Sequence, residues 1–296
     1  MLNLKKYLSS KQKLIETELD CLIEKGAGTN TIEKAMRYSL LAGGKRIRPI
    51  LCLAAAHAVG GDEKETIPAA CAIEMVHTYS LIHDDLPAMD NDHLRRGKPT
   101  SHIQFNEATA ILAGDALLTL AFDTLATAGQ NSNHMAAKWL KVIQMLAMAA
   151  GHKGMIKGQM QDISAEGMQL DIKQLESMHI LKTGAMIETA LIIGAHLAGG
   201  TIEQQHDLTI YGQKIGLAFQ VTDDLLNING NPQYMGKAVG TDQIRGKNTY
   251  PALLGLVESE CLAKNLIEQA LQALSLFNSK ADPLRMIARY IIDRNQ

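Results

Sequence analysis

The segment IEMVHTYSLIHDDLPAMDND (residues 73–92) decides how the rest of the chain is interpreted. Residues of one helix face recur in it at three- and four-residue spacing, as at Ile73, Val76 and Ser80, which is the period of a helix with one buried face. A second segment, residues 210–225, repeats the pattern. Strand-like alternation is scarce, and good helix formers outnumber aromatic residues, so the sequence predicts an all-α protein.

Glycine pairs and polar breaks divide the chain into about ten helical segments, and the only long polar connection lies at residues 229–249. A connection of that length within a compact domain is often functional. We expect helices at approximately 2–25, 31–41, 47–59, 66–86, 105–128, 134–150, 151–166, 171–199, 201–228, 250–275 and 279–294.

Composition places the chain among ordinary globular proteins. It has 296 residues, 20% of them charged, and a net charge of −2, which does not suggest a nucleic-acid partner. The N-terminus lacks the apolar core of a signal peptide, and no run of about 18 apolar residues predicts a membrane span. The four cysteines are far apart in sequence, so we expect reduced thiols and a cytoplasmic location.

The first acidic cluster lies where the helix predicted at residues 66–86 should end. Pro87 cannot continue a helix, which places Asp84 and Asp85 in its last turn and Asp90 in the loop that follows. The helix dipole and mutual repulsion both disfavour acids there. A bound divalent cation would turn this repulsion into coordination, and clustered carboxylates suit magnesium. A solvated acidic helix end is the alternative.

A second polar cluster ends another apolar helix. Gln220, Asp223, Asp224 and Asn227 are spaced i, i+3, i+4, i+7, so they form one stripe along that helix. Buried acids without partners would be costly. Two acidic clusters on separate helices can face each other and hold metal ions with a polyanion between them, for which a diphosphate is the obvious choice.

Cations suited to a diphosphate lie in the breaks between helices. Arginine forks match phosphate oxygens, and adjacent glycines let backbone amides approach. None of these sites has the GxxxxGK[ST] pattern of a P-loop, which argues against nucleotide hydrolysis. The basic segments are GGKRIRP (43–49), RRGK (95–98), KTG (182–184), GK (236–237) and GK (246–247).

Together these motifs resemble the trans-isoprenyl diphosphate synthase family, and within it the bacterial farnesyl diphosphate synthases. The similarity runs essentially the full length of the chain, through GGKRIRP, residues 74–100, ILAGDALL (111–118), KTGA (182–185), GLAFQVTDDLL (216–226) and GKNTYPALLG (246–255). The resemblance implies a single domain over residues 1–296, an all-α fold around a deep central cavity, a homodimer, and three magnesium ions.

The resemblance also assigns roles to individual residues. Asp84, Asp85 and Asp90 match the first aspartate-rich motif as metal ligands, and Asp223 and Asp224 match the second. Isopentenyl diphosphate would be held by Lys45, Arg48, His77 and Arg96, and the allylic diphosphate by Arg95, Lys182, Thr183, Gln220, Lys237 and Lys247. The second motif commonly ends in aspartate, but this chain has Asn227, so we expect weaker metal affinity there rather than lost activity.

The implied reaction removes diphosphate from an allylic carbon and leaves a carbocation, which the double bond of isopentenyl diphosphate attacks. The protein supplies no nucleophile, because metals and cationic side chains stabilise the charge that develops on the leaving group. Lys182, Thr183 and Gln220 have the side chains needed around the reacting carbon.

Product length should depend on how deep the apolar cavity runs below the first aspartates. Ser80 lies one turn before Asp84 on nearly the same face, and Tyr79 is rotated aside, so helix geometry alone leaves open which of them blocks the chain. In resembling enzymes an aromatic residue five positions before the motif, together with the spacing DDLPAMD, accompanies a fifteen-carbon product. We therefore expect farnesyl diphosphate, with geranylgeranyl diphosphate as the alternative.

Two other functions compete with this interpretation. His83-Asp84 is a dyad that HD-type phosphohydrolases use to bind metal, but the other histidines have no ligand spacing. A non-catalytic subunit of a prenyl synthase would explain Asn227, but the retention of the other acidic and basic residues argues against it.

Overall fold

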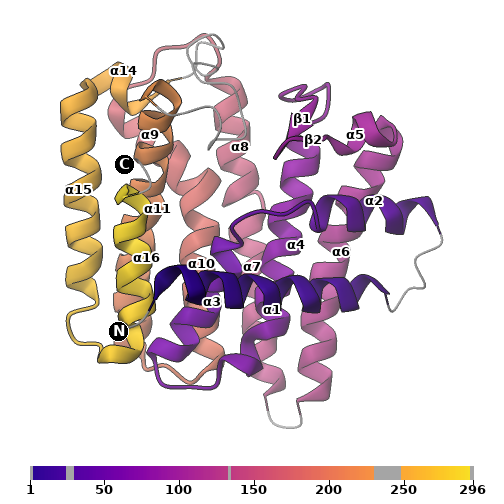
Figure 1. Cartoon of the computed structure of the whole chain (residues 1–296), viewed down its shortest axis with the longest axis horizontal. Coiled ribbons are helices and arrows are strands. Elements are labelled where there is room, and N and C mark those ends of the chain that lie inside the picture. The colour runs from indigo at the N-terminus through magenta and orange to yellow at the C-terminus, as the bar shows by residue number, and fades with distance from the viewer. Residues whose placement is uncertain (1–2, 25–29, 133–134, 230–247, 294–296) are drawn as a thin grey trace.

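The computed structural model describes residues 3–24, 30–132, 135–229 and 248–293, which are almost entirely helical (Figure 1). The all-α prediction is confirmed. The α-helices are α1 (Leu4–Glu24), α2 (Thr31–Leu40), α3 (Ile47–Ala58), α4 (Ile67–Asp84), α5 (Ser101–Gln104), α6 (Glu107–Asn131), α7 (Ala136–Ala150), α8 (Met155–Ser164), α9 (Ile172–His179), α10 (Ala185–Leu197), α11 (Ile202–Asn229), α14 (Tyr250–Leu254), α15 (Leu256–Ala273) and α16 (Asp282–Asp293). The described residues also include short 3₁₀ turns η1 (Glu63–Thr66) and η3 (Ser279–Ala281) and a π-helical turn η2 (Ile180–Gly184).

Side-chain caps fix where several helices begin. Asn106 accepts a hydrogen bond from the Thr109 amide at the start of α6. Asp171 and Gln174 form a reciprocal capping box at the start of α9. These contacts satisfy amides that have no partner within the helix, so the helix boundaries follow from local sequence.

The predicted helix boundaries agree with the structure to within a few residues, and three features differ. The predicted helix 250–275 is broken at Gly255, which has a φ of 88° and separates α14 from α15. The predicted helix 171–199 contains the π-helical turn between α9 and α10. After α4, strands β1 (Leu94–Arg95) and β2 (Lys98–Pro99) form an antiparallel hairpin.

The hairpin turn has an unusual backbone. Its two central residues, Arg96 and Gly97, have φ values of 54° and 76°. Two successive left-handed residues make the tight turn that matches the twist of the flanking strands. The turn therefore places Arg95 and Arg96, adjacent in sequence, at one end of the bundle, where Figure 1 shows the hairpin above α4.

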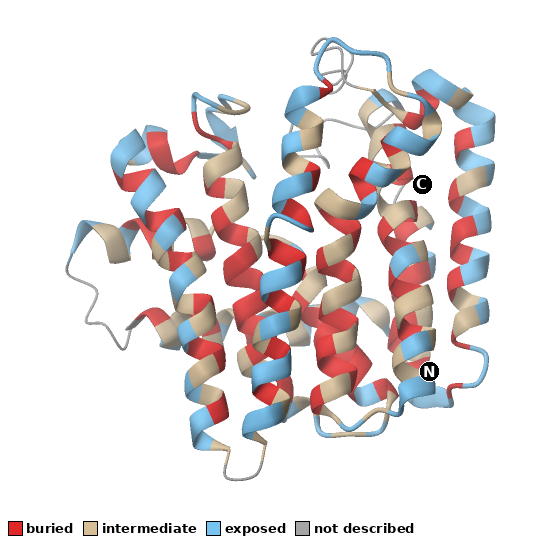
Figure 2. Ribbon diagram, turned by 180° about the vertical axis from the view of Figure 1, so that it is seen from behind, coloured by how far each residue is buried: buried red, intermediate tan, exposed pale blue. Residues whose placement is uncertain are grey.

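Two clusters of buried apolar side chains make up the core. One lies around α4, α6 and α7, and the other around α11, α15 and α16. Helices α3 and α10 contribute to both clusters, which favours the single domain that we predict. In Figure 2 the buried residues are concentrated along the inward faces of the central helices, and exposed residues lie along the outer ones.

Small residues let the central helices approach closely. A Cβ at Gly194 of α10 would lie 2.0 Å from the carbonyl oxygen of Cys52 on α3. A Cβ at Gly216 of α11 would lie 3.1 Å from the Cα of Gly184 in η2. Glycine at these positions brings the backbone of η2 against α11, which carries the second acidic cluster.

Two helical stretches, Glu107–Asn131 and Ile172–Leu197, are long and apolar enough to cross a membrane. Of their most apolar windows, 44% and 56% respectively is buried inside the protein, so the two helices are only weak evidence for a membrane span. The four cysteines, all within the described residues, carry free thiols, and Cys52 and Cys71 are buried.

Candidate functional site

The end of α4 folds back on itself. After Pro87 the chain returns so that the Asp90 amide donates to the Asp84 carbonyl oxygen at 2.9 Å. Burial raises the pKa of Asp84 to about 6, an effect that Lys182 opposes and Asp90 increases. A buried carboxylate beside another carboxylate is stabilised in its charged form by a cation, so Asp84 and Asp90 suit a divalent metal.

Asp85 faces a different partner. Its carboxylate accepts two hydrogen bonds from Arg95 Nε at 2.8 Å and one from Arg95 Nη2 at 2.5 Å, and the residue is only 3% exposed. Burial lowers the pKa of Arg95, but the bonds to Asp85 outweigh it and leave the pKa raised. Asp85 therefore holds the Arg95 guanidinium beside Asp84, and its role as a metal ligand stays a prediction.

The π-helical turn η2 carries Lys182 and Thr183. Such turns insert one extra residue into a helix and occur frequently at functional sites. Lys182 Nζ donates to Asp162 of α8 at 2.5 Å, and Lys182 also acts electrostatically on Asp84. A Cβ at Gly158 would lie 2.2 Å from the Lys182 amide nitrogen, so the glycine permits α8 to pack directly on this turn.

The second acidic cluster lies at the end of α11. Asp224 accepts a hydrogen bond from the Tyr250 amide at 2.9 Å, which fixes α14 against it. Asp223 acts on Arg48 of α3, raising the pKa of Arg48 against the larger lowering effect of burial. Gln220 is half-buried one turn earlier. Asp223 thus acts on Arg48, which in turn contacts His77 of α4, the helix that carries the first cluster.

Arg48, His77 and Arg96 form a cationic group beside α4. Arg48 Nη1 donates to His77 Nε2 at 3.3 Å, which requires the His77 proton on Nδ1. Burial and the positive charges of Arg48, Arg96, Arg95 and Arg46 lower the pKa of His77 well below its ordinary value. Among the described residues, the buried Arg48 Nε has no hydrogen-bond partner. An anion would satisfy that donor and relieve the repulsion.

Tyr79 is buried on α4, and burial raises its pKa to about 12. Its ring meets the His83 ring edge-on with centroids 5.7 Å apart. His83 Nε2 lies 3.1 Å from the carbonyl oxygen of Ile111 on α6. Ser80 Oγ donates to the carbonyl oxygen of His77 at 2.9 Å. The Tyr79 ring therefore rests on His83, which itself contacts α6, while the Ser80 hydroxyl is engaged with its own helix.

Of the three predicted basic residues not yet placed, the structure describes Lys45 alone. Lys45 Nζ lies over the ring of Tyr290 on α16, with 6.0 Å from the nitrogen to the centroid. Lys237 and Lys247 lie outside the described residues, as does most of the polar connection 229–249. Asn227 is half-buried at the end of α11.

Sequence reasoning missed Asp162, Arg46 and Glu74. Asp162 holds Lys182, and its signal is the segment GQMQD (158–162), where the acid lies one helical turn after Gly158. Arg46 donates to Glu74 at 2.6 Å in the interior of the protein. Arg46 lies in the basic segment GGKRIRP, but only Lys45 and Arg48 of that segment were assigned roles. For Glu74 the signal is a single glutamate within the apolar helix predicted at residues 66–86.

The acidic side chains fit magnesium in chemistry but do not form a complete site by themselves. Within the described ranges, no three acidic, histidine or cysteine side chains converge as metal ligands. Asp84 and Asp90 on one side, with Asp223 and Asp224 on the other, supply hard oxygen donors. Oxygens of a bound diphosphate would complete the coordination, so metal and polyanion should bind together.

Comparison with known proteins gives concordant matches. The polyprenyl synthetase family profile matches residues 29–281. A geranylgeranyl diphosphate synthase of Cyanophora paradoxa is 47% identical over 294 residues, which cover 99% of this chain and 97% of the relative. A farnesyl diphosphate synthase of Geobacillus stearothermophilus is 49% identical over 255 residues, covering 86% of each chain. A crystal structure of an FPP/GFPP synthase from Zymomonas mobilis has a TM-score of 0.84 at 37% identity and covers 96% of this chain and 98% of that chain.

The environment of His77 predicts a pH dependence of stability. Because its pKa is lowered in the folded protein, the unfolded chain binds more protons once the pH falls below the ordinary value of 6.5. The unliganded protein should therefore lose up to about 1.4 kcal/mol per pH unit there through this residue. Denaturant titrations from pH 7.5 to 5 should show a smaller loss for His77→Gln than for the native protein.

The control for this measurement is His57→Gln, which changes an exposed histidine on α3. It should follow the native pH dependence. If His77→Gln and the native protein lost stability in parallel, the neutral state of His77 would be disproved.

Proposed function

The chain belongs to the polyprenyl synthetase family, and we propose that this trans-prenyltransferase condenses isopentenyl diphosphate with dimethylallyl and geranyl diphosphate to give (E,E)-farnesyl diphosphate. The observation that carries the proposal is the arrangement around Lys182. The lysine is held by Asp162 and acts on Asp84, while the turn that carries it packs against α11. A cation held beside a carboxylate that suits a metal ion favours the departure of a diphosphate.

The allylic substrate would bind where the acidic residues and Lys182 come together. Lys182 and Arg95 would exchange their bonds to Asp162 and Asp85 for bonds to the leaving diphosphate. Bound magnesium, as the three ions that the resemblance implies, would be held by Asp84, Asp85, Asp90, Asp223 and Asp224 and would neutralise charge on that group. Thr183 and Gln220 would offer polar oxygens to the carbocation, and Lys237 and Lys247 would contribute further cations.

Isopentenyl diphosphate would bind the cationic group of Arg48, His77 and Arg96, with Lys45 turning from Tyr290 to join it. The unsatisfied Arg48 Nε and the mutual repulsion of these side chains favour a dianionic ligand. After the new carbon–carbon bond forms, a proton is lost to the departing diphosphate. The protein's residues thus bind and orient two anions without forming a covalent bond to either.

Farnesyl diphosphate is proposed as the product because Tyr79 lies five residues before Asp84, is buried, and is braced by His83. Geranylgeranyl diphosphate is the alternative, since the relative from Cyanophora paradoxa carries that name. Purified chain with isopentenyl and geranyl diphosphates and magnesium, followed by chromatography of the products, tests both. A fifteen-carbon product supports the proposal, and a twenty-carbon product supports the alternative.

Substitution of Asp84 tests the metal site. Asp84→Asn removes a charged oxygen ligand with little change in shape, so turnover at saturating magnesium should fall by about 100-fold or more. The matched control is Asp123→Asn, at an exposed position of α6, which should retain native turnover. Near-native turnover of Asp84→Asn would remove Asp84 from the metal ligands.

Substitution of Tyr79 tests the floor of the product cavity. Tyr79→Ala removes a buried ring that rests on His83, so product should extend from fifteen to twenty or more carbons. Tyr79→Phe keeps the ring and should keep the fifteen-carbon product. Chromatography that finds the same product from native protein and Tyr79→Ala would show that another residue limits the chain.

We also propose a cytoplasmic homodimer. Large apolar side chains are exposed on three neighbouring helices, at Leu112 of α6, Leu140 and Met148 of α7, and Ile156 and Met160 of α8. Exposed apolar surface of this kind is typical of protein interfaces. Sedimentation should give a dimer mass for the native protein, and Leu140→Glu with Met160→Glu should shift it toward monomer. A native monomer at micromolar concentration would contradict the proposal.

A further inference from the structure

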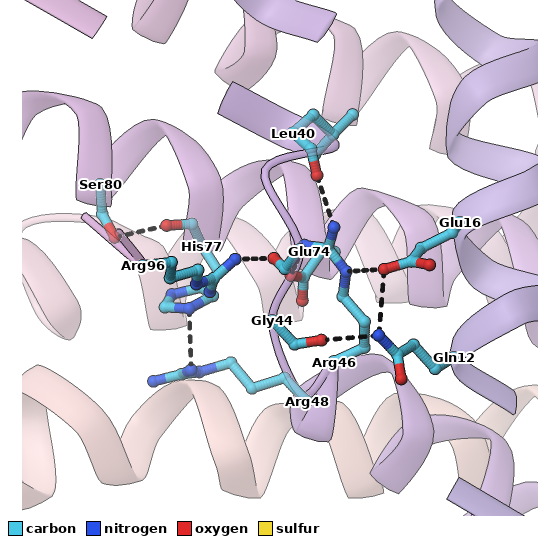
Figure 3. Close-up of polar contacts among 11 residues, drawn as sticks. Gln12, Glu16, Leu40, Gly44, Arg46, Arg48, Glu74, His77, Ser80 and Arg96 are labelled. Carbon is cyan, nitrogen blue, oxygen red and sulfur yellow. Dashed lines mark hydrogen bonds and ion pairs between the residues drawn. The ribbon is translucent and has the colours of Figure 1, made fainter. Parts of the chain in front are cut away.

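Residues 43–46 (Gly-Gly-Lys-Arg), in the connection between α2 and α3, are hydrogen-bonded to α1, α2 and α4. We call this segment the strap. Figure 3 shows its contacts. Gln12 of α1 donates to the Gly44 carbonyl oxygen at 3.1 Å. The side chain of Arg46, the last residue of the strap, extends into the interior toward Glu74 of α4 and Glu16 of α1.

Arg46 is the best-satisfied buried charge in this region. Its side chain is 0% exposed, and it donates to Glu74 at 2.6 Å, to the Leu40 carbonyl oxygen at 2.6 Å and to Glu16 at 3.3 Å. Its backbone has a φ of 51°, in the left-handed region that arginine rarely adopts. These bonds therefore hold the backbone in a conformation that it would not otherwise prefer.

Glu74 is equally enclosed, since it is 2% exposed in the middle of α4. It lies three residues before His77, hence on nearly the same helix face. Breaking a buried ion pair by removing one charge is costly, whereas replacing both charges with apolar groups is often neutral. Stability alone therefore does not account for an ion pair at this point.

The strap adjoins the two arginines of the cationic group, Arg48 and Arg96. Arg96 donates to the Gly43 carbonyl oxygen. A Cβ on Gly44 would lie 2.4 Å from the Arg96 guanidinium carbon, so the glycine leaves room for that side chain. Arg48 lies in the first turn of α3, two residues after Arg46. Glu74 raises the pKa of both Arg48 and Arg96 against the larger effect of burial. Movement of the strap would move both arginines.

We propose that Arg46 and Glu74 form a positioning pair, which fixes the strap and thereby sets Arg48 and Arg96 for the diphosphate of the non-allylic substrate. The inference rests on the proposed binding of isopentenyl diphosphate by that cationic group. Lys182 and Arg95, which serve the allylic diphosphate, are held by Asp162 and Asp85 instead. Loss of the pair should therefore affect one substrate and spare the other.

The test is the Michaelis constant for each substrate. Glu74→Gln keeps the shape and removes the charge, and KM for isopentenyl diphosphate should rise about tenfold or more, because small misplacements of binding groups have large effects. KM for geranyl diphosphate should stay within about twofold of native. Tyr211→Phe is the control, since it removes a buried hydrogen bond to the Leu284 carbonyl oxygen in the distant α11–α16 region. It should lower the melting temperature without a change in either KM.

A double substitution separates positioning from stability. Arg46→Met with Glu74→Leu replaces the pair by apolar groups and should recover the melting temperature that Glu74→Gln loses. KM for isopentenyl diphosphate should nevertheless stay raised, because nothing then ties the strap to α4. Native KM values in this stable variant, or equal increases for both substrates, would overturn the inference.

Arg48→Ala distinguishes a failure of this inference from a failure of the proposed function. If Arg48→Ala raises KM for isopentenyl diphosphate while both pair variants leave it native, only the positioning role is wrong. If Arg48→Ala leaves KM native, the proposed binding site is wrong and the positioning role falls with it.

Discussion

Three ion pairs between buried or partly buried side chains hold the cations of the site in place, and the site depends on this mutual compensation. Asp85 is bound to Arg95, Asp162 to Lys182, and Glu74 to Arg46. In a low-dielectric setting an uncompensated charge costs several kcal/mol, so each pair restricts where its cation can lie. The cations are thereby arranged before any ligand arrives, and little reorganisation is needed when a diphosphate binds.

Close helix packing is the second requirement. Glycines at positions 158 and 216 remove side chains that would separate η2 from α8 and α11. The π-helical turn then offsets Lys182 from the regular helix path. Lys182 thereby donates to Asp162 and interacts electrostatically with Asp84. A side chain at either glycine would displace the backbone of η2. Substitution at these positions should therefore disturb the site, although the glycines themselves have no functional side chain.

The cations proposed for the two substrate diphosphates are held in place by different contacts. On the allylic side the cations are paired with acids that lie near the proposed metal ligands, so partner exchange can accompany metal binding. On the other side Arg48 and Arg96 repel each other around a neutral His77, and their positions are set by the strap. The cations of the allylic side, Lys182 and Arg95, thus have acidic partners, whereas Arg96 donates to the Gly43 carbonyl oxygen and Arg48 to His77.

The sequence by itself determined the helices, the helix ends at which Asp84 and Asp223 lie, and the family resemblance, because helical period, caps and proline act over a few residues. Only the tertiary structure decided that Asp85 engages Arg95, that Lys182 engages Asp162, that Lys45 lies over Tyr290, and that Arg46 turns inward to Glu74. These partners are 10 to 245 positions apart, and which of several similar charges meet depends on how the helices pack. Local pattern carries no information about that choice, since burial and partner geometry are properties of the assembled fold.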